Sequence, residues 1–303
     1  MGAYVIAHVS DLHLGPIPPF LLRDWNVKRG LGVLNWHRKR KRLHSSDAWA
    51  MVLADMRASR PDHIALTGDL VNVGLPAEHE AAARWLADLG GPEEVTVVPG
   101  NHDIYTELRD DPGIERWRPY MENDDGSQGP VGGFPALRRR GPVAIVAMNS
   151  ARPTRPFDAS GRCGDRQIAA AAELLRGAGA EGLFRCLLIH HPPLPGQARR
   201  GRELRDAAEL RAMLEATGVE LVLHGHNHVD MVAEFTSVHG PAVVSGIASG
   251  STAAGGPDLP ARYALHAVLR SPTGWQLEST LKGLDGSGAI VDLGRTVREL
   301  PRG

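Results

Sequence analysis

Short apolar runs rich in β-branched residues recur along the chain, and helical patterns separate several of them. Each run is closed by glycine or by a cluster of polar residues, which is typical of strand ends. The expected strands cover residues 4–9, 63–67, 95–98, 143–148, 184–189, 219–223 and 241–247. The expected helices cover residues 46–59, 77–89, 165–176 and 203–217. This alternation predicts an α/β fold with a mostly parallel core sheet.

Glycine and proline predict where the elements end. The third helix should stop before Gly177, and the fourth should stop at Gly218. The segments "YALHAVLR" and "WQLESTLKGL" should pair as an antiparallel hairpin around residues 271–274. Residues 15–45 and 104–142, rich in proline, glycine and charge, should form loops or caps over one face.

We find no internal repeat and no clear linker, so we expect a single domain over residues 1–303. It carries a basic insert at about 20–45 and a cap region rich in Gly, Pro and acidic residues at about 104–142.

The composition is that of an ordinary soluble protein, with 42% hydrophobic residues, 23% charged residues and a net charge of -1. This balance predicts no specific nucleic-acid binding. Two cysteines, Cys163 and Cys186, do not form a disulfide framework. The first residues show no secretory signal pattern, and no apolar run approaches the length of a membrane span. We therefore expect a cytoplasmic protein.

Metal-ligating side chains follow five of the expected strands. The candidates are Asp11, His13, Asp69, Asn101, His190, His226 and His228. The carboxyl ends of strands are where open α/β sheets place their ligand crevice. Residues i and i+2 of an extended chain point the same way, so Asp11 and His13 can face one point, as can His226 and His228. Seven ligands suit two ions, and Asp69, alone on its strand end, suits the bridging position. Mixed nitrogen and oxygen ligands favour Mn, Fe, Zn or Co.

The ordered set D-x-H, G-D, G-N-H-D, H and G-H-x-H resembles the calcineurin-like metallophosphoesterase superfamily. The resemblance implies a four-layer α/β/β/α sandwich with mixed sheets and an active site at the carboxyl ends of the strands. It implies one metal held by Asp11, His13, Asp69 and His228, and a second held by Asp69, Asn101, His190 and His226.

The resemblance also implies two catalytic residues beside the metals. His102 should face the substrate, stabilise phosphoryl charge and help to protonate the leaving oxygen. Asp103 should orient the His102 ring and favour its protonated form. The implied reaction is hydrolysis of a phosphodiester or phosphomonoester by a hydroxide held between the two metals.

The segments "HVSDLHLG", "GDLVNVG", "VVPGNHD", "FPALRRRGPVAIVAMNS" and "LVLHGHNH" are most similar to the bacterial class III cyclic-nucleotide phosphodiesterases. A 3′,5′-cyclic nucleotide is thus one candidate substrate. The chain departs from that branch at Asn72, where the branch often carries Asp, and in its basic insert.

The basic insert has three interpretations. Residues 23–44 contain eight Lys or Arg residues and one acidic residue, which gives a net charge of +7, together with Trp25 and Trp36. The segment is a solvated lid balanced by the acidic 107–125 region, a cap that grips an anionic substrate, or a patch that contacts anionic lipid.

Other functions share these residues. A pyrophosphatase acting on a lipid-linked nucleotide sugar would use the insert at the membrane surface. A nuclease is disfavoured by the balanced charge and the lack of an aromatic and basic groove. A non-catalytic protein-binding scaffold is disfavoured because His102 and all seven ligands are present. The sequence predicts no oligomeric state.

Overall fold

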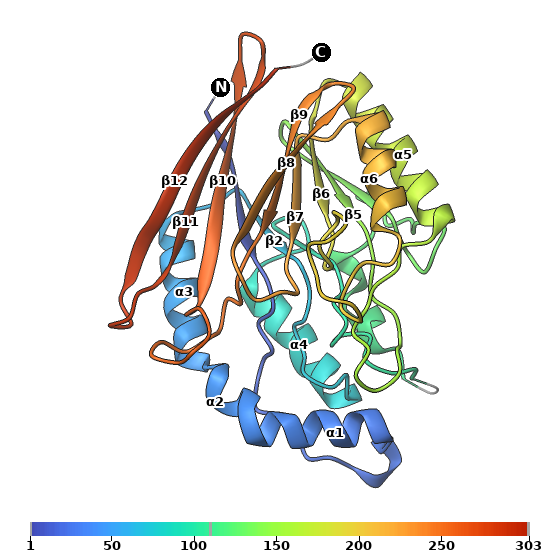
Figure 1. Cartoon of the computed structure of the whole chain (residues 1–303), viewed down its shortest axis with the longest axis vertical. Coiled ribbons are helices and arrows are strands. Elements are labelled where there is room, and N and C mark those ends of the chain that lie inside the picture. The colour runs from blue at the N-terminus through green and yellow to red at the C-terminus, as the bar shows by residue number, and fades with distance from the viewer. Residues whose placement is uncertain (1, 109–110, 302–303) are drawn as a thin grey trace.

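Two mixed six-stranded sheets form the centre of the molecule (Figure 1). The computed structural model describes residues 2–108 and 111–301 of the chain. The strand order is β12-β11-β10-β1-β2-β3 in the first sheet and β4-β5-β6-β7-β9-β8 in the second. The α/β class and the mixed sheets that the resemblance implied are confirmed, whereas the mostly parallel core sheet expected from the alternation alone is not found.

The first sheet has a parallel half and an antiparallel half. The parallel strands are β1 (Tyr4–Val9), β2 (His63–Leu66) and β3 (Val95–Val97). The antiparallel strands are β10 (Arg262–Ser271), β11 (Gly274–Leu284) and β12 (Ile290–Pro301). The β10–β11 hairpin is confirmed, and β12 extends the sheet with a strand that the sequence did not predict.

The second sheet has a parallel centre and two antiparallel edges. The central strands are β5 (Val143–Ala147), β6 (Phe184–Leu188), β7 (Leu221–His224) and β9 (Gly240–Gly246). The edge strands are β4 (Ala136–Arg140) and β8 (Met231–Ser237). Neither edge strand was expected.

The alternation of side chains along β5 shows why the sheets stack. Val143, Ile145 and Ala147 join the hydrophobic cluster that the two sheets share. Ala144 and Val146, between them, join a second cluster with Leu175 and other helical residues. Successive side chains of a strand point to opposite faces, so a strand that is apolar at every position is buried on both faces.

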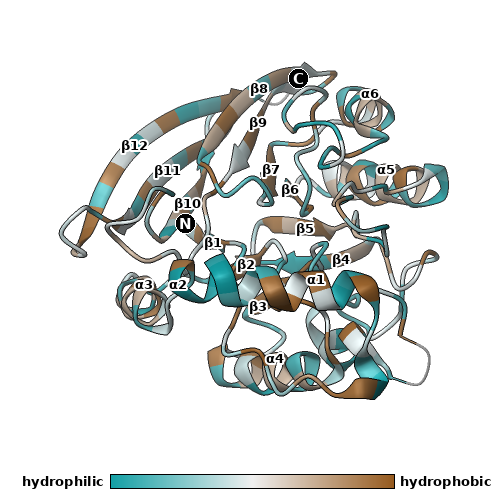
Figure 2. Ribbon diagram, turned by 60° about the horizontal axis from the view of Figure 1, so that its bottom comes forward, coloured by the Kyte–Doolittle hydropathy of each residue, from teal (hydrophilic) through white to brown (hydrophobic). Residues whose placement is uncertain are grey.

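Helices cover the outer faces of both sheets and complete the four layers (Figure 2). The helices α3 (Ser46–Ala58) and α4 (Pro76–Leu89) lie on one side, and α5 (Asp165–Ala180) and α6 (Ala207–Thr217) lie on the other. The predicted α/β/β/α sandwich is confirmed. None of the helices in residues 2–108 and 111–301 has the length and apolar character that crossing a membrane requires.

Two of the helix ends differ from the prediction. α5 continues through Gly177 to Ala180, because Ala178 is buried and Gly179 allows the helix to pack closely on the Arg185 side chain. A glycine inside a helix costs roughly 1 kcal/mol relative to alanine, and burial of this turn offsets that cost. α6 begins at Ala207 rather than at residue 203, and it ends as predicted at Gly218, whose φ is 82°.

The basic insert, expected to form loops or a cap, is helical. It contains a 3-10 turn (Leu22–Asp24), α1 (Val27–Asn35), a π-helical turn (Trp36–Arg40) and α2 (Lys41–Leu43). The Asn26 side chain caps α1 by accepting a hydrogen bond of 2.9 Å from the Arg29 amide. Lys28 and Arg29 then donate to the carbonyls of Tyr105 and Gly74, at 2.9 and 2.7 Å. The insert is therefore docked on the loops that follow β2 and β3, across one end of the molecule (Figures 1 and 2).

The other expected cap, residues 104–142, is only partly irregular. It contains a 3-10 helix (Gly113–Tyr120) and the strand β4, while residues 109 and 110 lie outside the described residues. Trp117 is fully buried and donates to the carbonyl of His79 in α4, at 3.0 Å. This contact fixes the 3-10 helix against α4, whereas Tyr105, at the start of the region, stacks on the His102 ring with 5.2 Å between the centroids.

Candidate metal centre

The residues that the sequence singles out lie together at the carboxyl ends of five strands. Asp11 and His13 follow β1, Asp69 follows β2, and Asn101 follows β3. From the second sheet, His190 follows β6, while His226 and His228 follow β7. Six of these seven side chains are buried, and His228 is partly buried. The two sheets therefore supply donors to one enclosed site from opposite sides.

Three of the seven side chains form one group. The Nε2 atom of His228 lies 3.2 Å from Oδ1 of Asp11 and 3.3 Å from Nε2 of His13. A second group contains His190, whose Nε2 lies 3.2 Å from Oδ1 of Asn101 and 3.2 Å from Nδ1 of His226. The first group brings together three of the residues predicted to hold one metal, and the second brings together three of those predicted to hold the other.

Asp69 lies between the two groups. Its Oδ2 atom is 3.8 Å from Nε2 of His13 and 3.5 Å from Nε2 of His190. Its other oxygen, Oδ1, accepts a hydrogen bond of 2.7 Å from the backbone amide of His102. The carboxylate is thus held by the backbone on one side and faces both groups on the other.

Backbone strain is concentrated at these residues. Asp11, His13, Asp69, His226 and His228 adopt positive φ angles between 44° and 71°. Elsewhere in the described residues, only Arg60 and Phe157 do so among residues other than glycine. Such a conformation is disfavoured for a side chain with a Cβ, and it persists where the surrounding structure imposes it, often at functional sites.

The hydrogen-bond partners of the imidazoles leave their lone pairs facing inward. His13 Nδ1 contacts the carbonyl of Val71 at 3.1 Å, and His190 Nδ1 contacts that of Thr67 at 2.6 Å. A carbonyl only accepts, so the proton of each ring lies on Nδ1 and the Nε2 lone pair is free. This is the arrangement that metal-ligating histidines commonly use.

An unsatisfied buried atom also fits a cation. Oδ1 of Asp11 makes no hydrogen bond within residues 2–108 and 111–301, and Nε2 of His228 lies 3.2 Å from it. Burial, followed by the charge of Asp11, raises the pKa of Asp69, whereas burial lowers the pKa of His13 and His226. Crowded carboxylates beside neutral imidazoles are stabilised by positive charge, and this donor set suits Mn, Fe, Zn or Co.

The predicted role of Asp103 is wrong in one respect. Its carboxylate does not orient the His102 ring, because it accepts hydrogen bonds from the backbone amides of Asp69 (2.8 Å), Val71 (3.0 Å) and Gly100 (2.8 Å). These bonds fix the two loops that carry Asp69 and Asn101. Asp103 therefore positions the backbone of the site rather than the imidazole next to it in sequence.

His102 is held by other partners. Its Nδ1 donates to the carbonyl of Asn72, and Nη2 of Arg40 lies 2.8 Å from its Nε2. Burial, followed by the charge of Arg40, holds the pKa of His102 well below its usual value. We expected Asp103 to favour the protonated ring, but its carboxylate is bonded to backbone amides instead. The ring also meets that of His13 edge-on, with 4.9 Å between their centroids.

A pocket of about 520 Å³ opens beside Asn101 and His102. The basic side chains of its lining are Lys28, Arg38, Arg40 and Arg202. The apolar part includes Leu31, Leu34 and Phe157. Because α1 and the π-helical turn supply much of this lining, the insert forms one wall of the pocket. The cap interpretation therefore agrees with the structure better than the solvated lid.

The acidic 107–125 region balances the insert only in part, through the charge of Asp111, which acts on Arg29. In the described part of the chain, the ion pairs of this region are made with Arg116, Arg118, Arg138 and Arg140, which lie outside residues 23–44. Within the insert, Arg40 and His44 reach the site, and neither was predicted individually from the sequence. Their only signal was the unusual density of basic residues.

The comparisons with known proteins agree with this geometry. The sequence profile of the family described as "Calcineurin-like phosphoesterase" matches residues 4–230. A cAMP/cGMP dual specificity phosphodiesterase of Mycobacterium tuberculosis is 27% identical over 243 residues, which cover 78% of this chain and 65% of that protein. A Synechococcus protein named "Probable cyclic nucleotide phosphodiesterase" is 28% identical over 226 residues, which cover 74% of this chain and 72% of that protein.

Solved structures share the fold at much lower identity. A dimetal phosphatase from Danio rerio superposes with a TM-score of 0.59 at 13% identity, over 98% of this chain and 100% of that chain. This likeness supports the four-layer architecture alone. The profile match covers most of the chain and contains every predicted ligand, so the chain belongs to the calcineurin-like phosphoesterase family.

Proposed function

We propose that this chain is a phosphodiesterase that works with two metal ions of the Mn, Fe, Zn or Co group. The observation that carries the proposal is the position of Asp69, whose Oδ2 faces Nε2 of His13 at 3.8 Å and Nε2 of His190 at 3.5 Å. When bound, two such ions supply Lewis acidity, which activates water and offsets negative charge on a phosphoryl group. Asp11, His13 and His228 would hold one ion with Asp69, and Asn101, His190 and His226 would hold the other.

The side chains around the metals have separate tasks in this proposal. His102 lies at the pocket beside Asn101, where its Nε2 can meet a phosphoryl or leaving oxygen once Arg40 turns from the ring to the substrate anion. Asp103 keeps the loops of Asp69 and Gly100 in place through its three backbone hydrogen bonds. Lys28 and Arg202 add positive charge to the pocket wall and favour an anionic substrate.

A cyclic nucleotide is the substrate that the relatives suggest. Both curated relatives carry cyclic-nucleotide phosphodiesterase names, although the match spans only 65% of the Mycobacterium protein. The pocket joins basic side chains with an apolar wall, which suits an anionic phosphate attached to a base or another apolar group. We also propose that the enzyme is cytoplasmic and that the chain folds as a single domain.

Manganese-dependent turnover of bis(p-nitrophenyl) phosphate tests the reaction. We expect hydrolysis in the loaded protein and almost none after chelation or in Asp69→Asn. Absence of turnover with each of Mn, Fe, Zn and Co would favour the non-catalytic scaffold. A panel of cyclic nucleotides, phosphomonoesters and nucleotide sugars would then define the substrate.

An amphiphilic substrate at a lipid surface is the second candidate, and exposed apolar residues favour it. Leu22 and Phe157 are each 93% exposed, and Trp25 is 58% exposed. Leu22 and Trp25 are close in sequence to Leu31 and Leu34 of α1, which are also exposed. Apolar side chains beside a segment of net charge +7 are typical of surfaces that contact anionic lipid.

Flotation with vesicles containing anionic phospholipid distinguishes the two substrates. Binding to these vesicles that is lost in Leu22→Ser/Trp25→Ser would support an amphiphilic phosphate ester, such as a lipid-linked nucleotide sugar. Absence of binding, with turnover of cyclic nucleotides, would support the first candidate.

A further inference from the structure

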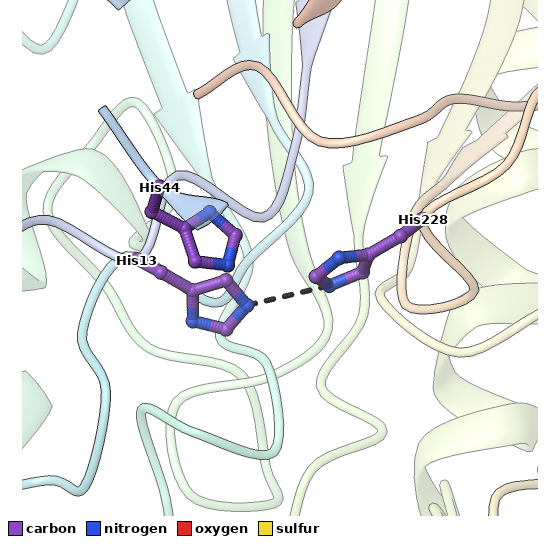
Figure 3. A group of neighbouring side chains, drawn as sticks. All are labelled: His13, His44 and His228. Carbon is purple, nitrogen blue, oxygen red and sulfur yellow. Dashed lines mark hydrogen bonds between the residues drawn. The ribbon is translucent and has the colours of Figure 1, made fainter. Parts of the chain in front are cut away.

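The basic insert brings a third imidazole to the first group of ligands. One ring nitrogen from each of His13, His44 and His228 lies within 4.8 Å of the others. The centroid of the His44 ring is 4.5 Å from that of His13 and 5.8 Å from that of His228. Figure 3 shows the three rings converging, with His228 approaching from the side opposite to His13 and His44. No motif of the sequence predicted this contact.

A chain of hydrogen bonds fixes the tautomer of His44. The Ser249 hydroxyl donates to the carbonyl of Asp11 at 2.7 Å, and the Ser251 hydroxyl donates to that of Leu12 at 2.6 Å. With its proton committed, the Ser251 oxygen accepts from Nδ1 of His44, which is 2.8 Å away. The proton of the His44 ring therefore lies on Nδ1, and Nε2 carries the lone pair.

That lone pair has no partner in the described protein. Nε2 of His44 is buried and makes no hydrogen bond within residues 2–108 and 111–301. Leaving a buried polar atom unsatisfied costs about 1–3 kcal/mol, so such an atom calls for a ligand. His13 has the same pattern, with Nδ1 bound to a carbonyl and Nε2 facing inward.

The backbone around His44 is held in place independently of any metal. The amide of Ser45 donates to the carbonyl of Ser251 at 2.8 Å, and the amide of Ala253 donates to that of Leu43 at 2.8 Å. Through Ser249 and Ser251, the same loop is bound to the backbone of Asp11 and Leu12. The loop after β9 therefore fixes His44 relative to the ligands that follow β1, as a preformed site requires.

We propose that His44 is an additional nitrogen ligand of the metal held by Asp11, His13 and His228. The proposal rests on the proposed dinuclear site and adds a ligand from the insert, outside the motifs of the family. It also links two parts of the site, because the segment that ends at His44 carries Arg40, which contacts His102. Binding of the first metal would then add a further anchor to the wall of the substrate pocket.

Metal binding to the metal-free full-length protein tests the proposal without any substrate. Wild type, His44→Ala and a matched control, His37→Ala, are titrated with Co²⁺ by calorimetry and by visible absorption; His37 lies on the same insert and is exposed. We expect His44→Ala to weaken one of the two sites at least about 10-fold and to change the Co²⁺ absorption bands, because a nitrogen ligand is lost. His37→Ala should match wild type.

A second variant and a second readout protect the test against misfolding. Ser251→Ala keeps the imidazole but removes the acceptor of its Nδ1 proton, and we expect a smaller loss of affinity at the same site. Addition of metal should slow hydrogen exchange of the backbone at 36–44 in wild type and much less in His44→Ala.

The outcomes separate this inference from the proposed function. If His44→Ala and wild type show the same affinities, absorption bands and exchange protection, His44 is not a ligand, even if the variant turns over substrate more slowly. If wild type binds no metal, the proposed function itself fails.

Discussion

The guanidinium of Arg40 lies against the imidazole of His102, with Nη2 2.8 Å from Nε2 and Nη1 3.1 Å from Nδ1. Because Nδ1 donates to the carbonyl of Asn72, only the contact at Nε2 is a hydrogen bond. The insert thereby places a cation at the position where an anionic substrate would meet His102.

Arg40→Ala should lower kcat/KM for a phosphodiester roughly 10- to 100-fold, since a hydrogen bond to a charged group contributes about 1.5–3 kcal/mol. Steady-state kinetics on bis(p-nitrophenyl) phosphate measure the loss. Arg42→Ala, an exposed position on the same insert, is the control and should behave as wild type. Equal kinetics in the two variants would remove Arg40 from the substrate site.

His102→Ala should keep both metals and lose rate. The ring lines the pocket and its backbone amide holds Asp69, so truncation of the side chain leaves that amide in place. Loss of a positioned group that takes part in proton transfer lowers turnover about 10²- to 10⁴-fold. Asn101→Ala provides the contrast, because it should lose metal as well as rate. Elemental analysis and turnover on the same samples separate the two, and an unchanged rate in His102→Ala would contradict the proposed role.

Asp103→Ala should destabilise the protein by about 3 kcal/mol or more. The buried carboxylate accepts three backbone hydrogen bonds, and their amides would be left without a partner. Urea unfolding of the metal-free protein measures the free energy. Asp125, an exposed carboxylate that accepts from the Ser127 amide at 2.9 Å, is the control, and Asp125→Ala should cost less than about 1 kcal/mol. Similar losses in both variants would contradict the assigned role.

His63 should make the fold sensitive to acid. Burial, followed by the charge of Arg140, lowers the pKa of this β2 residue to about 3, whereas it is about 6.5 in an unfolded chain. Above pH 6.5 neither state is protonated and the stabilisation is complete. As the pH falls from 6.5 towards 3, the unfolded chain takes up the proton first, so the free energy of unfolding falls by up to about 1.4 kcal/mol per pH unit.

Urea unfolding between pH 7 and pH 5 checks this slope on the metal-free protein. His63→Gln should show a shallower dependence than wild type, whereas His37→Gln, at an exposed position, should not. Identical slopes in His63→Gln and wild type would mean that His63 contributes nothing to the effect.

The seven candidate ligands could be predicted because each follows a short apolar strand, and the carboxyl ends of these strands lie at the same end of the two sheets. The groups around His13 and His190 form where the sequence analysis expected them, and Asp69 lies between them. What the pattern could not show was backbone direction. Asp103 follows His102 directly, but its amide closes a turn onto the carbonyl of Gly100 at 3.1 Å, which directs the carboxylate back to the backbone.

The contributions of the insert were unpredictable for a different reason. Arg40 meets His102 across 62 positions of sequence, and His44 meets Ser251 across 207. No local pattern encodes such contacts. The first depends on how α1 docks through Lys28 and Arg29, and the second depends on the loop after β9, which is bonded to the backbone of Leu43 and Ser45. The edge strands β4 and β8 were missed because their arginine-rich or mixed sequences lack the apolar runs of the central strands.

The proposal that two metal ions would share Asp69 is tested most directly by manganese binding. Protein stripped of metal is loaded with Mn²⁺, and the bound ions are counted by elemental analysis and examined by electron paramagnetic resonance. We predict two ions per chain with a spin-coupled spectrum in wild type, and loss of the coupling in Asp69→Ala. A single ion, or two ions without coupling in wild type, would contradict the claim.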